Sequence, residues 1–152
     1  MQCRPLLAMM ILVTGCGDSG PEADSYTGVW LLTSVNVQPL PWAGNATGGE
    51  VWLGARLELG RQSGTFDRCL ETSPVSIPLK RSTGVVVTPI SGDRLEVSYF
   101  DRSEAVPDTA TLNGTELTLR YRNVISGEVQ GVDVLTFIPL TGPDLTPCSV
   151  LP

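Results

Sequence analysis

Residues 51–59 read VWLGARLEL, and this stretch decides how the chain folds. Every odd-numbered position in it is apolar, whereas the even-numbered positions include Arg56 and Glu58. A period of two is typical of a β-strand that buries one face. A slip of one residue would turn every apolar side chain of the stretch into water, so the register is well determined. On this pattern Trp52 belongs to the polar face.

The same alternation recurs between turn signals along the rest of the chain. It predicts strands near residues 28–35, 65–70, 75–79, 83–88, 95–100, 109–112, 117–121 and 132–138. Asn113-Gly114 predicts a type I′ hairpin turn, since both residues tolerate positive φ. Pro74 and Pro78 place the piece at 75–79 at a sheet edge or in a loop. No window carries a convincing helical period. Eight or nine strands at hairpin spacing favour an antiparallel meander, and closure into a barrel would remove its edges.

Composition excludes several classes of function. The chain has 152 residues, enough for one domain, and its 16 glycines and 12 prolines favour short strands and tight turns. There is no histidine, which excludes Ser-His-Asp triads, Cys-His pairs and the usual zinc sites. The net charge of -6 argues against a nucleic-acid partner, because binding phosphates requires a basic surface.

The N-terminus indicates export. Arg4 precedes the apolar run 6–13, which is too short to span a bilayer but suits a signal peptide. The following Thr14-Gly15-Cys16 resembles a bacterial lipobox. That resemblance implies a signal peptide over 1–15, a lipid-modified Cys16, a flexible tether over 16–25 and a domain over 26–152. The protein would then be held on a membrane of the cell envelope, facing an extracytoplasmic compartment, by acyl chains that contribute about 0.8 kcal/mol per buried methylene. The alternative is an ordinary secretory signal with a chance cysteine.

The remaining cysteines predict a disulfide. Cys3 leaves with the signal peptide and Cys16 carries lipid, so Cys69 and Cys148 remain in an oxidising compartment, where an even pair usually bonds. A Cys69–Cys148 bond would pin the proline-rich tail, 139–152.

Gly28-Val29-Trp30 resembles the Gly-x-Trp signature of lipocalin-type barrels, and residues 26–36 resemble the opening strand of lipocalin-like domains in bacterial lipoproteins. The resemblance implies an all-β, antiparallel, eight-stranded up-and-down barrel. It also implies that Trp30 closes one barrel end and that an arginine from the last strand packs across it. Because residues 132–138 contain no arginine, we expect Arg120 or Arg122 to take that role.

Two non-enzymatic functions follow from such a barrel. A hollow barrel, with a cavity of about 300 Å³ or more, would hold a small apolar or amphipathic ligand among its inward side chains. These are expected to be Val51, Leu53, Leu57, Leu59, Leu95, Val97, Leu117 and Leu119. A filled barrel would instead present its loops to an envelope protein, as an interaction or inhibitor-like module.

Trp42, in a Pro-rich loop, and Trp52 are candidate contacts for a ligand or partner. Otherwise the loop folds back to cap one barrel end. No catalytic residue, cofactor or metal site is predicted, since neither the scattered carboxylates nor Lys80 forms a recognisable pair or motif.

Overall fold

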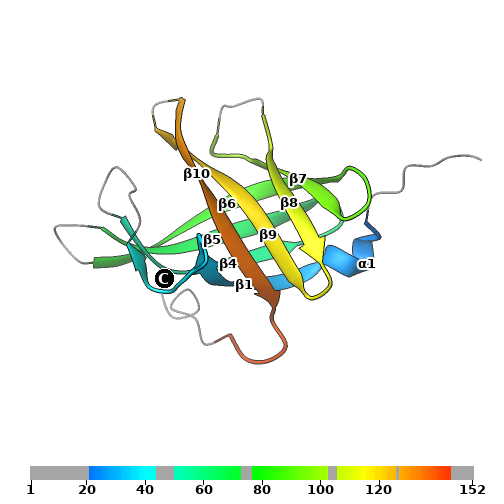
Figure 1. Ribbon diagram of the computed structural model, residues 1–152, viewed down its shortest axis with the longest axis horizontal. Helices are drawn as coiled ribbons and strands as arrows, with labels where there is room; N and C mark the ends of the chain where they lie inside the picture. The colour runs from blue at the N-terminus through cyan, green and yellow to red at the C-terminus, as the bar shows by residue number, and fades with distance from the viewer. Residues whose placement is uncertain (1–20, 44–49, 73–76, 103–105, 126, 145–152) are drawn as a thin grey trace, which may run out of the picture.

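The structure, a computed structural model, describes residues 21–43, 50–72, 77–102, 106–125 and 127–144. They form one short helix and ten strands (Figure 1). In chain order these are α1 (Ala23–Tyr26), β1 (Gly28–Val35), β2 (Gln38–Pro39), β3 (Trp42–Ala43), β4 (Glu50–Leu59), β5 (Ser63–Thr72), β6 (Ile77–Pro89), β7 (Arg94–Tyr99), β8 (Asp108–Asn113), β9 (Glu116–Ile125) and β10 (Glu128–Pro139).

The eight longer strands form a closed antiparallel barrel. From β4 to β10 each strand pairs with the next along the chain, and β1 pairs with both β4 and β10. Trp30 of β1 lies opposite Leu57 on one side and Pro139 on the other, which closes the sheet. The short β2 and β3 belong to the connection between β1 and β4. The predicted fold, an all-β, antiparallel, eight-stranded up-and-down barrel, is therefore confirmed.

The helix α1 marks one end of the barrel, which we call the closed end. Tyr26, the last residue of α1, is fully buried and its hydroxyl donates to the carbonyl of Arg61 at 2.9 Å, beside the β4–β5 turn. Trp30 is also buried, and its indole N–H donates to the carbonyl of Tyr26 at 2.8 Å. Trp30 thus packs at one barrel end. Residues 23–25 form a helical turn where the sequence suggested flexible tether, and 16–20 lie outside the described residues.

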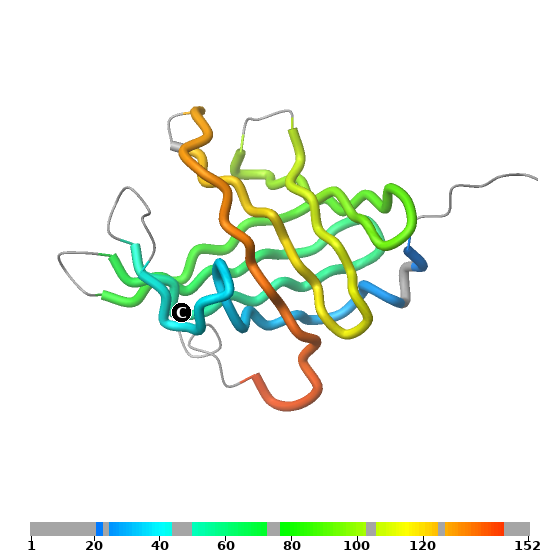
Figure 2. The backbone as a smooth tube through the Cα atoms, in the orientation of Figure 1, coloured from blue at the N-terminus to red at the C-terminus, as the bar shows by residue number. Residues whose placement is uncertain are grey.

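The opposite end, which we call the open end, is uneven in height. There β4, β5 and β6 project to one side and the β9–β10 hairpin to another, whereas β7 and β8 are short (Figure 2). The pairing of β6 with β7 begins only at Val85, and that of β8 with β9 only at Thr109. The wall of the barrel is therefore lowest across β7 and β8.

A bulge in β4 changes which side chains face inward. Trp52 pairs with Leu70 but Gly54 pairs with Cys69, so the register shifts by one residue between them. Leu57 and Leu59 face the core as predicted. Beyond the bulge the parity reverses, because the extra residue is left unpaired. Trp52 becomes buried, while Val51 and Leu53 are only partly buried. The prediction that Val51 and Leu53 line the interior is wrong for this reason; Leu95, Val97, Leu117 and Leu119 are fully buried as predicted.

The predicted strands at 75–79 and 83–88 are parts of one strand, β6. Pro78 lies in β6 opposite Glu71 of β5, at a level where the described residues give β6 no second strand neighbour. A proline is tolerated at such an edge because its missing N–H breaks no ladder on the paired side. The expectation of an edge position for Pro78 was right, and the expectation of a separate strand was wrong.

The turn at Asn113-Gly114 is not of the predicted type I′. Asn113 pairs with Glu116, so the central turn residues are Gly114 and Thr115, and the positive φ of +61° falls on Gly114. A glycine with positive φ at the first central position is typical of a type II′ turn. The chain instead places positive φ at two successive residues in the β1–β2 turn, at Asn36 (φ 50°) and Val37 (φ 67°). Asn36 is held there by its side chain, whose Oδ1 accepts from the N–H of Val134 at 2.8 Å.

Candidate functional site at the open end of the barrel

Aromatic rings fill the barrel toward its open end. The cluster consists of Trp52, Phe66, Tyr99, Tyr121 and Phe137, all of them buried. Six ring pairs within it have centroids 5.8–6.5 Å apart, in tilted or edge-to-face arrangements. Such pairs add about 0.5–1.5 kcal/mol beyond the area they bury. Trp52, predicted as an exposed contact, is thus part of the interior packing, because the β4 bulge turns it inward.

The Pro-rich loop folds back over this cluster. Trp42 of β3 lies opposite Trp52 of β4 and is half-buried. Both Trp42 and Leu40 pack against the core. This arrangement fits the second interpretation of the loop, in which it caps a barrel end.

Arg102, just beyond β7, also covers the aromatic cluster at the open end. Its guanidinium carbon lies 4.4 Å from the ring centroid of Tyr99 and 4.3 Å from that of Tyr121. Its Nη1 donates to Oδ2 of Asp108 at 3.1 Å. A cation–π contact is strongest where water is excluded, and the Arg102 side chain is only 12% exposed.

Asp108 is shared between two arginines. Its side chain is 0% exposed, and Oδ1 accepts from Nε of Arg122 at 2.7 Å while Oδ2 accepts from Arg102. The main-chain N–H of Arg122 also lies 3.3 Å from Oδ2. Partners of this kind offset the cost of taking so deeply buried a carboxylate out of water. Burial by itself would lower the pKa of Arg102, but the nearby Tyr121 and Asp108 outweigh it and raise that pKa above its ordinary value.

The two tyrosines of this site have different hydroxyl environments. The Tyr121 hydroxyl accepts a hydrogen bond from Nη1 of Arg68 at 2.6 Å. The Tyr99 hydroxyl is buried and makes no well-formed hydrogen bond among the described residues, although the Asp108 carboxylate lies nearby. Burial, followed by the negative charge of Asp108, raises the pKa of Tyr99 well above its ordinary value. Tyr99 is therefore a neutral phenol at every physiological pH.

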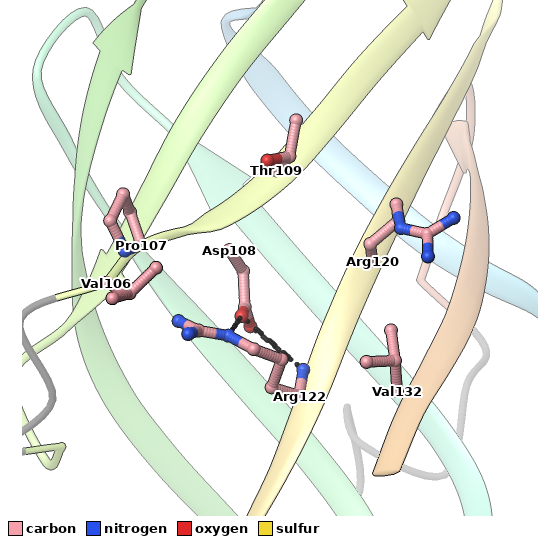
Figure 3. A pocket seen from close by; sticks show the side chains of 7 residues that line it. All are labelled: Val106, Pro107, Asp108, Thr109, Arg120, Arg122 and Val132. Atoms are coloured by element: carbon pink, nitrogen blue, oxygen red, sulfur yellow. Dashed lines mark hydrogen bonds and ion pairs between the residues drawn. The ribbon is translucent and has the colours of Figure 1, made fainter. Parts of the chain in front are cut away.

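A pocket of about 150 Å³ lies on the outside of the barrel beside this cluster (Figure 3). It is formed where the start of β8 meets the projecting β9–β10 hairpin. Its lining residues are Val106, Pro107, Asp108, Thr109, Arg120, Arg122 and Val132. In Figure 3 the side chain of Arg122 turns toward Asp108, whereas the guanidinium of Arg120 points away from both, on the side of Val132.

A second, open pocket of about 390 Å³ lies against the β4–β5 hairpin at the closed end. Its lining is Glu58, Leu59, Gly60, Ser63, Gly64 and Thr65. The one charged side chain of this lining, Glu58, is held by Arg56 at 2.9 Å. This pocket offers few convergent polar groups, so the open end is the better candidate for binding.

Arg120 and Arg122 do not pack across Trp30. Both lie on β9 between Leu119 and Asn123, where alternation points them out of the barrel, and Trp30 points inward at the closed end. Arg122 is bound to Asp108 instead, and Arg120 is exposed. The assignment of either residue to barrel-end packing is therefore wrong.

The buried charged side chains of the open end were not predicted from the sequence, although the strand alternation contains a signal for two of them. Arg68 shares the inward parity of Phe66 and Leu70 on β5. Asp108 shares the inward parity of Ala110 on β8. A charged residue on the apolar face of a strand needs a buried partner, and that mismatch marks both positions.

Several predictions fall on residues that the structure does not describe. Cys16 and Cys148 lie outside the described residues, so lipid attachment and the Cys69–Cys148 bond stay predictions. Across the described ranges, no helix has the length and hydropathy needed to span a membrane. Within the same ranges, no group of three or more His, Cys, Asp or Glu side chains is placed to hold a metal ion.

Comparisons with known proteins do not assign this chain to a family. No protein-family model matches the chain. A search of curated proteins finds no match either. Among solved structures, the chain is similar to lobster apocrustacyanin A1 with a TM-score of 0.41 and 11% sequence identity. The alignment covers 78% of this chain and 63% of the crustacyanin chain, which is less than two thirds of its length.

Proposed function

We propose that the protein is a non-enzymatic binding module of the cell envelope, anchored by lipid on Cys16, that binds a small amphipathic ligand on the outside of its open end. The observation that carries this proposal is the contrast between a filled interior and an arginine-lined pocket outside it. The alternative of a ligand held deep inside the barrel is less well supported.

The packing of the open end argues against an internal carrier. A drug-sized ligand needs roughly 300 Å³ or more of enclosed space. Here the aromatic cluster, Trp42 and the buried Arg102 occupy the route into the barrel. Removing Arg102 from its place would leave Asp108 with one arginine fewer at 0% exposure, which is costly.

The same contacts argue against catalysis at this site. A general base must be free to accept a proton. The Asp108 carboxylate accepts from two guanidiniums, and the Tyr99 phenol holds its proton because its pKa is raised. The chain offers no imidazole to replace them.

The anchor and the disulfide complete the proposal. Cys69 lies on the outward face of β5, opposite Lys80, and is nevertheless fully buried. Asp144, four positions before Cys148, approaches Nε of Arg56 on the neighbouring strand β4 at 3.7 Å. Both observations support a tail that runs over this face and a bond between Cys69 and Cys148. Mass spectrometry of the mature protein tests both modifications, through the acyl mass on Cys16 and a disulfide-linked peptide pair.

A partner protein is the second candidate, and one observation favours it. Apolar side chains are exposed around the open end, including Val37 (85%), Ile77 (59%) and Val129 (51%). Val37 also has a positive φ, which is unfavourable for a β-branched residue. Strain at an exposed position often marks a functional surface.

Native mass spectrometry distinguishes the two candidates. The mature protein would be released from its own membranes in mild detergent and sprayed intact. We expect a reproducible extra mass of a few hundred daltons, beyond the covalent acyl chains, that organic solvent removes. A bare polypeptide, or a complex with a second protein that carries no small molecule, would overturn the small-ligand proposal.

A further inference from the structure

The pocket outside the open end carries an excess of positive charge. Three guanidiniums lie in or beside it, those of Arg102, Arg120 and Arg122, against the single carboxylate of Asp108. Asp108 already serves Arg102 and Arg122. This local excess stands out in a chain whose net charge is -6.

Arg120 is the group of this pocket that lacks a counter-charge. It is exposed, and among the described residues no hydrogen bond or ion pair engages its guanidinium. Glu96 of β7 lies in the same outward row but is separated from Arg120 by Thr109, which pairs with both. An anion entering the pocket would therefore meet a guanidinium free to bind it.

Arg122 adds positive charge to the pocket but is already paired with Asp108. Its Nε is fixed by the buried Asp108 at 2.7 Å, which leaves its two terminal nitrogens with donors to spare. Figure 3 shows the Arg120 guanidinium pointing away from Arg122 and Asp108, on the side of Val132, so Arg120 is the arginine of this pocket that is available to an anion.

Apolar side chains flank these charges. Val106 is 62% exposed and Val132 is 44% exposed, and Pro107 is a further apolar residue of the lining. A volume of about 150 Å³ is roughly five times the share of one water molecule in the liquid, or a head group and one or two carbons. Any longer apolar chain must therefore lie along Val106 or Val132 at the mouth of the pocket.

We infer that this pocket binds the head group of a single-chain anionic amphiphile, with Arg120 on a carboxylate or phosphate and with apolar residues of the lining, Val132 nearest to Arg120, against the carbons next to it. This inference rests on the proposed function and names the class of its ligand. The chemistry is shared by a free carboxylic acid and a phosphate monoester, so the experiment uses one probe of each kind.

The test is calorimetric titration of the mature protein, held by its anchor in nanodiscs of neutral lipid, with empty nanodiscs as the blank. The probes are hexanoate, hexyl phosphate, hexanol and inorganic phosphate, which are too short or too polar to form micelles. Arg120→Gln removes the unpaired charge. Arg94→Gln is the matched control, because Arg94 is an exposed arginine on β7 at the closed end.

We expect hexanoate, hexyl phosphate or both to bind, and Arg120→Gln to weaken that binding by about tenfold, the loss of one charge-assisted hydrogen bond. Arg94→Gln should leave the affinity unchanged. Which probe binds more tightly identifies the head group. An equal loss of affinity in Arg120→Gln and Arg94→Gln, or no loss of affinity in either variant, would overturn the assignment of the anion to this pocket.

Equally tight binding of hexanol would overturn the role of the anion, and equally tight binding of inorganic phosphate would overturn the role of the carbon chain. These results separate from those for the proposed function. A neutral ligand found by native mass spectrometry would keep the binding module and reject the anionic amphiphile. A bare polypeptide in native mass spectrometry, combined with Arg120-dependent binding of hexanoate in the titration, would keep the anion site and reject the proposal that the protein carries a small ligand in its own membranes.

Discussion

Replacing each tyrosine of the open end by phenylalanine isolates the contribution of its hydroxyl. Tyr99→Phe and Tyr121→Phe both keep the ring, and therefore the stacking with Arg102 and with the aromatic cluster. The two variants differ only in what the lost hydroxyl contacted. Tyr121 accepts from Arg68 at 2.6 Å, whereas the Tyr99 hydroxyl is buried and makes no well-formed hydrogen bond among the described residues, although Asp108 lies near enough to raise its pKa.

The expected free energies of unfolding have opposite signs. A hydrogen bond to a charged group contributes about 1.5–3 kcal/mol, so Tyr121→Phe should destabilise by about 2 kcal/mol. A buried polar group without a partner costs about 1–3 kcal/mol, so Tyr99→Phe should stabilise by up to about 1 kcal/mol. The variants should thus differ by about 3 kcal/mol, or roughly 6–12 °C in Tm for a chain of this size.

Urea titration followed by tryptophan fluorescence measures both variants against the wild type at pH 7. Equal urea slopes would show that the comparison concerns stability alone. If Tyr99→Phe proved as destabilising as Tyr121→Phe, the reasoning would be refuted, because the Tyr99 hydroxyl would then have a partner such as a buried water.

Three further predictions concern the same structure. Because burial and the nearby Asp108 raise the pKa of Tyr99 in the folded protein, the unfolded chain releases this proton first, and the stability of the fold falls as the pH rises above about 10. Urea midpoints at pH 9 and pH 11 should therefore differ less in Tyr99→Phe than in the wild type. Asp108→Ala leaves two arginines without their buried carboxylate and should cost about 3–5 kcal/mol by urea titration; a cost below 1 kcal/mol would mean that the ion pairs are solvated. Gly64→Ala places a methyl against the main-chain carbonyl of Glu58 and should cost about 1–3 kcal/mol. Gly84→Ala meets only the ring of Phe100, which is exposed and can turn away, so its cost should stay within about 0.5 kcal/mol. Thermal unfolding compares the two alanine variants, and a lower Tm for Gly84→Ala than for Gly64→Ala would contradict this prediction.

The sequence was sufficient to predict the architecture because strand alternation is a local property. The stretch 51–59, the turn near Gly114 and the opening strand at 28–35 each indicate a strand or a turn without knowledge of the rest. The errors arose where pairing between strands decides the outcome. The bulge between Trp52 and Gly54 depends on how β4 meets β5, and no feature of β4 alone reveals it.

The candidate site could be predicted less well for a similar reason. Asp108 and Arg122 are 14 positions apart, and Arg68 and Tyr121 are 53 positions apart, so closure of the barrel is what brings them together. The tryptophans stood out in the sequence because they are rare and large. Trp30 and Trp52 are buried and Trp42 is half-buried, whereas the exposed charged group of the pocket at the open end is the guanidinium of Arg120.

The closure of the barrel by β1 and β10 also sets the order in which this chain can fold during synthesis. The hydroxyl of Thr33 donates to the carbonyl of Thr136, which is made 103 residues later. Until β10 has left the ribosome, β1 lacks one of its two neighbours and the growing sheet keeps open edges, which are prone to pair with other chains. Contacts so distant in sequence also slow folding, because a long loop must be ordered before they form. The native barrel can therefore close only after β10 has been made, and any factor that acts earlier on the growing chain encounters a barrel that is still open.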